Sequence, residues 1–529
     1  MTALRSLRFS LLLPLLAATA CGAAVTSAHP GRPSARRPVA QKTPLPTASA
    51  EPPEPAASAG RPTPLPGPLA EIEGDAPITL ETVGHAGRFL SYCAARADSD
   101  GNGRLEVRAG AAGALSGDQL RPELAIGGRQ AELIDDLLGY DAGGRFVVVR
   151  TARIVSLIDV FGGARVDLSA LGFDDRDDVL QNRHHRALAF DPRGEWLAYL
   201  RQADTTTLVL RELTSGQERV LSPLPGDPWR LEWDASGEWL VVWSVVEDGN
   251  KNGRLDWPAR IAKKARMACD PPVPRFSVNP EVGDRPSAVV VRRDGADARV
   301  VTDFLMPYGK DLLTRAKDGP LVLEREGKKR TIATAECGAR VLHADPTRGQ
   351  LLIACTNGKT PLRASVELLT PAGRLDLGVT VQPTNIDRWP GAPTRLFPLY
   401  PGSEVLLLDL ERKKPLSLRP GDRVVTTSGT RALVRRAASL FFYDAETATE
   451  TPLVSDTGRF ANVVVDGSLV AVGSRVIDVG AGKLLGTVDG RPLALTPEGD
   501  VLVADGGAAD AERLARAPLR WRKPAAPID

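Results

Sequence analysis

Two stretches of this chain repeat one pattern 43 residues apart. Residues 190–199 read FDPRGEWLAY and residues 233–242 read WDASGEWLVV, so an aspartate, a glycine and a hydrophobic run recur in the same order. A repeat of about 40–45 residues is typical of a propeller, in which each repeat forms one four-stranded blade. Radial repetition also lets a chain of 529 residues bury its sheets without one very large core. The period therefore predicts an all-β fold.

The same turn-and-strand pattern recurs along the chain. Clear copies begin at Tyr140, Phe190 and Trp233, weaker ones at Gly84, Ala344 and Leu495, and degenerate ones near Tyr400, Thr427 and Val465. Residues 300–430 do not divide cleanly into repeats. We expect a single β-propeller over residues 76–525, with seven four-stranded blades or eight.

A second pattern places an acid four residues before a glycine. It occurs at Asp159–Gly163, Glu212–Gly216 and Asp478–Gly482, and Asp444–Ala448 is the same element with alanine in the glycine position. An acid that starts a turn and a residue with positive φ that closes it predict a hairpin at the outer edge of each blade. Two hairpins in each repeat give four strands.

In the first pattern, the turn glycine is followed by Arg or Glu, then Phe or Trp, then Leu or Val. These G-[RE]-[FW]-[LV] runs resemble the repeats of TolB-like and WD40-like β-propeller proteins. The resemblance extends from about Ile78 to Lys523. It implies the propeller fold, and it does not imply one function, because propellers carry many different activities.

The N-terminus is typical of an export signal. Arg5 and Arg8 precede an apolar run at 9–18 that is too short to span a bilayer. Small residues before Cys21 resemble a bacterial lipobox, so residues 1–21 are interpreted as a lipoprotein signal peptide with the lipid on Cys21. Export would place the protein on the periplasmic side or the surface of the outer membrane. An ordinary A-x-A cleavage site, giving a secreted or soluble periplasmic protein, is the alternative.

Residues 22–75 have the composition of a tether. Twelve prolines lie between Pro30 and Pro68, with mostly alanine, serine and threonine around them. Such a segment buries too little apolar surface to offset the entropy of ordering, so we expect a disordered linker.

Four cysteines remain after Cys21, and an oxidising compartment would allow them to form disulfides. They are Cys93, Cys269, Cys337 and Cys355. Cys337 and Cys355 are close enough in sequence to lie on neighbouring strands, so we expect this pair first. Free, buried cysteines are the alternative.

Two acidic loops match each other. Residues 98–106 read DSDGNGRLE and residues 248–256 read DGNKNGRLD. Oxygen donors at positions 1, 3, 5 and 9, a glycine at 6 and a backbone carbonyl at 7 follow the calcium-loop pattern, although the glutamate of position 12 is missing. The candidate ligands are Asp98, Asp100, Asn102, Arg104 and Glu106 in the first loop, and Asp248, Asn250, Asn252, Arg254 and Asp256 in the second. The alternative is that these residues simply form hairpin turns.

The spacing of the loops indicates equivalent positions in the fold. Gly87 precedes Asp98 by eleven residues, and Gly237 precedes Asp248 by eleven. We therefore expect the loops to follow equivalent strands of two different blades. These blades should be three blades apart, and both loops should lie on the same rim.

Charge and motifs favour a binding protein. A net charge of +2 gives no electrostatic case for nucleic acid, and no G-x-S-x-G nucleophile motif occurs. We expect a monomeric, non-enzymatic scaffold that binds an envelope protein or a glycan, with calcium as its only candidate cofactor and membrane contact only through the lipid. The alternative is an envelope hydrolase or lyase with its site at the channel mouth.

Overall fold

A computed structural model describes residues 68–525 with internal gaps. The gaps are 73–77, 85–86, 100, 104, 106, 110–114, 118, 174–186, 203–204, 250, 252, 254, 256–286, 296–297, 302, 316–318, 326, 347, 357–363, 382–394, 401–404, 455–462 and 505–518. The predictions for the signal peptide, for Cys21 and for most of the linker lie outside the described residues. No helix in the described part is long and apolar enough to cross a membrane.

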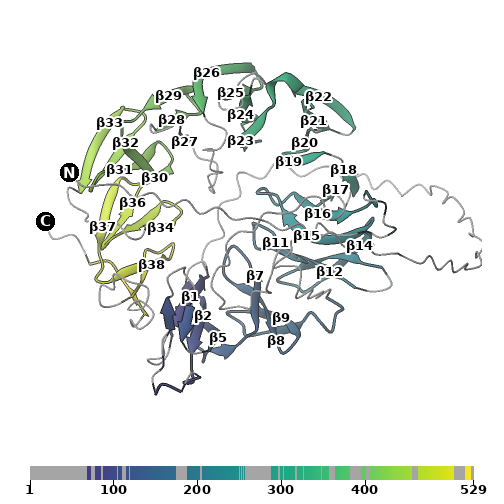
Figure 1. The fold of residues 1–529 in the computed structure, drawn as a ribbon, viewed down its shortest axis with the longest axis vertical. Coiled ribbons are helices and arrows are strands. Elements are labelled where there is room, and N and C mark those ends of the chain that lie inside the picture. Colours follow the sequence, from purple (N-terminus) through teal and green to yellow (C-terminus); the bar gives the residue numbers. More distant parts are fainter. Residues whose placement is uncertain are drawn as a thin grey trace, which may run out of the picture. The chain divides into compact units, whose positions relative to one another are not determined.

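The described chain is an all-β propeller, which confirms the predicted fold class (Figure 1). The first five blades are four-stranded antiparallel sheets. Blade 1 has β1 (Ile78–Val83), β2 (Phe89–Ala95), β5 (Leu120–Ile126) and β6 (Glu132–Leu133); blade 2 has β7 (Asp136–Tyr140), β8 (Phe146–Thr151), β9 (Ile154–Asp159) and β10 (Arg165–Asp167); blade 3 has β11 (Leu188–Phe190), β12 (Trp196–Arg201), β13 (Thr207–Glu212) and β14 (Glu218–Pro223); blade 4 has β15 (Asp227–Trp233), β16 (Trp239–Val245), β17 (Ser287–Arg292) and β18 (Arg299–Val301); blade 5 has β19 (Phe304–Tyr308), β20 (Asp311–Arg315), β21 (Leu321–Arg325) and β22 (Lys328–Ala333).

Five more blades follow, of which two have three described strands. Blade 6 has β23 (Arg340–Asp345), β24 (Gln350–Thr356), β25 (Ala364–Thr370) and β26 (Gly373–Val381); blade 7 has β27 (Leu396–Leu399), β28 (Leu406–Asp409) and β29 (Lys414–Ser417); blade 8 has β30 (Asp422–Ser428), β31 (Arg431–Arg436), β32 (Ser439–Asp444) and β33 (Thr449–Val454); blade 9 has β34 (Val463–Asp466), β35 (Leu469–Val472), β36 (Arg475–Asp478) and β37 (Lys483–Thr487); blade 10 has β38 (Arg491–Leu495), β39 (Val501–Ala504) and β40 (Leu519–Arg522). A separate hairpin, β3 (Val107–Ala109) with β4 (Leu115–Gly117), is inserted in blade 1, and the 3-10 helix η2 (Ala335–Cys337) precedes blade 6.

The predicted number of blades was wrong, because the described chain has ten rather than seven or eight. Nine of the ten blades contain one of the repeat copies found in the sequence, including the weaker and degenerate ones, and blade 5 contains none. Its first turn joins Tyr308 to Asp311 through Gly309 and Lys310, without the aspartate that marks the clear copies. The later blades are also shorter than 43 residues, since Leu396 begins blade 7 and Asp422 already begins blade 8.

Alternate side chains of each strand explain how the blades pack. In β8, Val147 and Val149 belong to the core shared with blade 1, whereas Phe146 and Val148 belong to the core shared with blade 3. Successive side chains of a strand point to opposite faces of the sheet, so a blade buried on both faces needs a continuous apolar strand.

The cores connect the blades in an unbroken circuit. Shared clusters join each of the ten blades to the next one in the chain. A further cluster joins blade 10 to blade 1 through Leu502 and Ala494 of blade 10 and Leu90 and Tyr92 of blade 1.

The aspartates of the first pattern form turns, as predicted. Asp191 Oδ1 accepts the backbone N–H groups of Glu195 and Trp196 at 2.7 and 2.8 Å, and Gly194 has a φ of 70°. Asp234 makes the equivalent contacts with Glu238 and Trp239 at 3.0 and 2.9 Å. These carboxylates satisfy the backbone at the rim where the first and second strands meet.

The second pattern also forms the predicted outer turns. Gly163, Gly216 and Gly482 all have positive φ values. Ala448 adopts the same left-handed conformation, with a φ of 53°, where the other turns have glycine. Its turn is held by the Asp444 carboxylate, which accepts the N–H of Glu446 at 2.9 Å.

Candidate functional site: the paired acidic loops

The two acidic loops occupy equivalent positions in blades 1 and 4. The first follows β2 and leads to β5, and the second follows β16 and leads to β17. Each therefore connects the second strand of its blade to the third, and blades 2 and 3 lie between them in the chain. Equivalent connections of a propeller lie on one rim, so the structure agrees with the spacing inferred from Gly87 and Gly237.

The first loop is a tight turn around Asp98. Its Oδ1 accepts the N–H groups of Gly101 and Asn102 at 2.7 and 3.1 Å, and its Oδ2 accepts that of Gly103 at 2.6 Å. Gly101 and Gly103 have φ values of 72° and 78°. The base of the insertion is held by the N–H of Gln119, which donates to Ser99 Oγ at 2.6 Å.

The second loop repeats this geometry. Asp248 Oδ2 accepts the N–H of Gly253 at 2.7 Å, just as Asp98 binds Gly103. Lys251 occupies the position of Gly101 and still has a φ of 60°. A lysine rarely adopts this conformation, so the shared backbone shape is not only a consequence of glycine content.

Three of the predicted calcium ligands lie among the described residues, namely Asp98, Asn102 and Asp248. The other seven lie outside them. The hydrogen bonds show that the first aspartate of each loop shapes the turn. Within the described part of the chain, no group of three histidine, cysteine, aspartate or glutamate residues could hold a metal ion. Both carboxylate oxygens of Asp98 and the Oδ2 of Asp248 accept backbone N–H groups of their own loops.

Each loop also displays an aliphatic side chain. Leu105 and Leu255 occupy the same position of the two loops, and each is 38% exposed. The two loops therefore expose a leucine at the same position.

Acidic residues in the blades are engaged in structural contacts. Burial raises the pKa of Asp141 to about 6, although backbone N–H groups of Phe146 and Gly143 counteract the shift. Burial also raises the pKa of Asp191. Burial acts in the same direction on Asp409, but hydrogen bonds from Arg395 and the backbone keep the pKa of that carboxyl below its usual value. Asp141 and Asp191 are 2% and 1% exposed and form turns, which leaves little access for a substrate.

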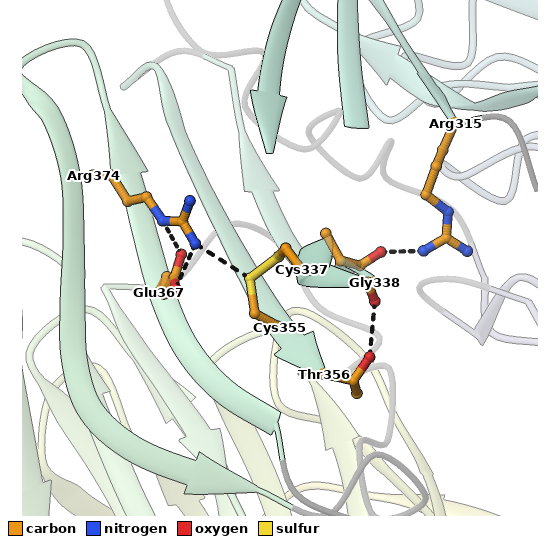
Figure 2. The surroundings of a disulfide bond; sticks show 8 residues. Arg315, Cys337, Gly338, Cys355, Thr356, Glu367 and Arg374 are labelled. Carbon is orange, nitrogen blue, oxygen red and sulfur yellow. Dashed lines mark hydrogen bonds and ion pairs between the residues drawn. A yellow bond between two sulfur atoms is a disulfide. The ribbon is translucent and has the colours of Figure 1, made fainter. Parts of the chain in front are cut away.

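The structure contains the Cys337–Cys355 disulfide, the pair that the sequence favoured (Figure 2). It ties η2 to β24, and both sulfur-bearing residues belong to the core between blades 5 and 6. Arg374 Nη2 lies 3.5 Å from Cys355 Sγ and also donates to Glu367 Oε1 at 2.7 Å. Cys93 is disulfide-bonded too. Its partner lies outside the described residues.

Comparisons with known proteins give only distant likenesses. No protein-family model matches the sequence, and no curated protein does. The propeller domain of the trilobed protease from Pyrococcus furiosus aligns over 77% of this chain and 94% of its own, at 8% identity and a TM-score of 0.27. Dipeptidyl peptidase 4 from Porphyromonas gingivalis aligns over 74% and 56%, at 10% identity and a TM-score of 0.36. TolB from Acinetobacter baumannii aligns over 64% and 60%, at 10% identity and a TM-score of 0.20.

These likenesses are distant and do not assign a function to this chain. The chain spans between 55% and 59% of the length of the first three peptidases that it matches. The chain is a β-propeller with ten blades in its described part.

Proposed function

We propose that this chain is an exported, lipid-anchored β-propeller that binds an envelope protein or a glycan and catalyses no reaction. The observation that carries this proposal is the matched pair of exposed loops, with Asp98 and Leu105 in one and Asp248 and Leu255 in the other. Two equivalent, chemically similar surfaces on one rim suit recognition at two points. The burial of the blade carboxylates in turns supports binding over acid–base chemistry.

Calcium would stabilise the two loops in this proposal. Oxygen donors at alternate positions can converge on one cation, and a bound cation would offset the repulsion among Asp98, Asp100 and Glu106. The test is isothermal titration of the full chain with calcium chloride. Saturable binding that is lost in the Asp98→Ala/Asp248→Ala double variant supports the cation site. If the heat of titration is the same for the wild type and the double variant, the loops do not bind calcium.

Partner binding is tested by photo-crosslinking. A photoreactive amino acid replaces Leu105, Leu255 or, as a control, Val220, which is 54% exposed on β14. In cells that produce the protein, positions 105 and 255 should yield the same adduct, and position 220 should not. A soluble glycan partner is tested by binding the purified chain to a glycan array. If positions 105 and 255 give no adduct and no glycan is retained, the two loops are not the binding surface.

A further inference from the structure

A short segment before β1 lies in the seam between the first and last blades. We call residues 68–72 the strap. Ala70 is completely buried in the core shared by blades 1 and 10, and Ile72 packs against the same core. The sequence placed these residues in the linker, but they pack with the propeller.

Two hydrogen bonds hold the centre of the strap, one from each side of the seam. The N–H of Ala70 donates to the carbonyl of Gly87 in blade 1 at 2.8 Å. The indole N–H of Trp521 in blade 10 donates to the carbonyl of Ala70 at 2.8 Å. Both backbone groups of one residue are thereby used, as in the recognition of an extended peptide.

Glycines make room for the strap. A side chain on Gly127 would place its Cβ 2.1 Å from the carbonyl oxygen of Pro68. A Cβ on Gly87 would lie 2.5 Å from the ring of Trp521 and 3.1 Å from Leu69. The seam is therefore shaped to accept a backbone, with a small side chain at position 70.

Among the described strands, none is exchanged between the two blades that meet at the seam. Blade 1 is built from β1, β2, β5 and β6 and blade 10 from β38, β39 and β40, and no described strand of one blade pairs with the other. Among the described residues, side-chain packing and the strap connect the two blades across the seam. Pro68 and Glu71 are exposed on either side of Ala70. A five-residue segment held in this way can leave without unfolding a blade.

We propose that the seam between blades 1 and 10 is a peptide-binding site, and that the strap is its built-in competitive ligand. The external ligand is an extended segment of a partner protein, with a small residue at the position of Ala70 and aliphatic residues at the positions of Leu69 and Ile72. The strap itself shows which chemistry fits. Because the strap is part of the same chain, its high effective concentration keeps the site closed until the strap is displaced.

This site is separate from the paired acidic loops. Gly87 lies in the turn between the first and second strands of blade 1, and Gly127 follows its third strand. Those turns lie at the rim opposite the second-to-third connections that carry Asp98 and Asp248. Failure of the loop proposal would leave the seam proposal intact, and the reverse also holds.

The test uses a fluorescent peptide of residues 67–73, GPLAEIE, and anisotropy titration of full chains. In the Ala70→Arg variant the strap no longer fits, so the peptide should bind at least tenfold more tightly than to the wild type. Adding Gly127→Val to that variant blocks the seam and should abolish binding. A peptide with arginine in place of its alanine should bind none of the chains. Equal binding to wild type and variant, or no binding to a folded Ala70→Arg chain, would overturn the proposal.

A second measurement covers the case in which Ala70→Arg does not fold. Trp521→Phe removes one of the two hydrogen bonds and keeps an aromatic ring. Hydrogen exchange at the Ala70 amide should become at least fivefold faster in this variant, while β8 and β9 of blade 2 keep their protection. Unchanged exchange at Ala70 would show that the strap is not a releasable ligand.

Discussion

Trp521 donates its indole N–H to the carbonyl of Ala70 at 2.8 Å, although the two residues are 451 positions apart in the chain. This contact crosses the seam where the last blade meets the first. Every other pair of neighbouring blades is consecutive in sequence. Blades 1 and 10 are not, so this seam alone depends on contacts between the two ends of the propeller.

Loss of the seam hydrogen bond should destabilise the propeller modestly. Trp521→Phe keeps most of the buried ring but leaves the Ala70 carbonyl without its donor, which costs about 1 kcal/mol. Urea unfolding of the full chain measures the change. Trp243→Phe, which removes an indole hydrogen bond to Glu232 within blade 4, serves as the control for a lost donor away from the seam. If Trp521→Phe unfolds at the same urea concentration as the wild type, the hydrogen bond to Ala70 contributes nothing to stability.

Removal of the Cys337–Cys355 disulfide should cost more. The bond closes a loop with a sequence separation of 18 residues, and a loop of that size corresponds to about 3 kcal/mol. The Cys337→Ala/Cys355→Ala variant should lower the free energy of unfolding by that amount. Dithiothreitol should then cause a smaller further loss in the variant than it causes in the wild type. An unchanged midpoint in the variant would contradict the assigned role.

Ala448 should be replaceable by glycine with a gain in stability. Its φ of 53° is unfavourable for a residue with a Cβ, so Ala448→Gly should stabilise the protein by about 0.5–1 kcal/mol. Ala164→Gly is the matched control, because Ala164 is an exposed alanine of an outer turn that lacks a positive φ. That change should destabilise slightly. The prediction fails if both substitutions shift the thermal midpoint in the same direction.

Asp141 should make stability depend on pH. Burial raises its pKa from an ordinary 3.8 to about 6, so the folded state binds the proton more tightly than the unfolded state. The resulting stabilisation is fully present below pH 4 and is lost as the pH rises through 6, by about 3 kcal/mol at most. The Asp141→Asn variant cannot titrate and should lack this component.

The measurement is the difference in unfolding free energy between wild type and Asp141→Asn at several pH values. Relative to the variant, wild type should lose stability between pH 4 and 7. Asp234→Asn changes the equivalent turn of blade 4 and controls for alteration of the cap itself. A difference that is constant across this range would rule out titration of Asp141.

The fold class could be predicted because the turns of this protein require particular residue types at fixed positions. Asp191 and Asp234 must accept backbone N–H groups, and Gly194 and Gly237 must adopt positive φ, so the residue types are fixed by the geometry. Blade 5 has Gly309 in a short turn without an aspartate, and no such constraint marks it. The blade count therefore needed the structure.

Contacts between distant residues could not be read from the repeats. Arg395 pairs with Asp409 at 2.9 Å, and Arg436 pairs with Asp422 at 2.7 Å, both across 14 residues. That spacing is a signal that the sequence contained and that was missed. The strap contains proline like the linker before it, and only its packing against Trp521 distinguishes it.

The position of the acidic loops was predictable and their conformation was not. A count of eleven residues from Gly87 and from Gly237 placed Asp98 and Asp248 after equivalent strands. The left-handed φ of Lys251 has no sequence signal of its own, and it became visible only by comparison with Gly101.

The most direct test of the central claim is the affinity of the crosslinked partner for chains that lack the loop leucines. Leu105→Ala and Leu255→Ala should each weaken binding about tenfold, as expected for a buried interface residue, and the double variant should weaken it further. Val220→Ala should bind like the wild type. If the double variant binds the partner as tightly as the wild type, the paired loops are not the binding surface of this propeller.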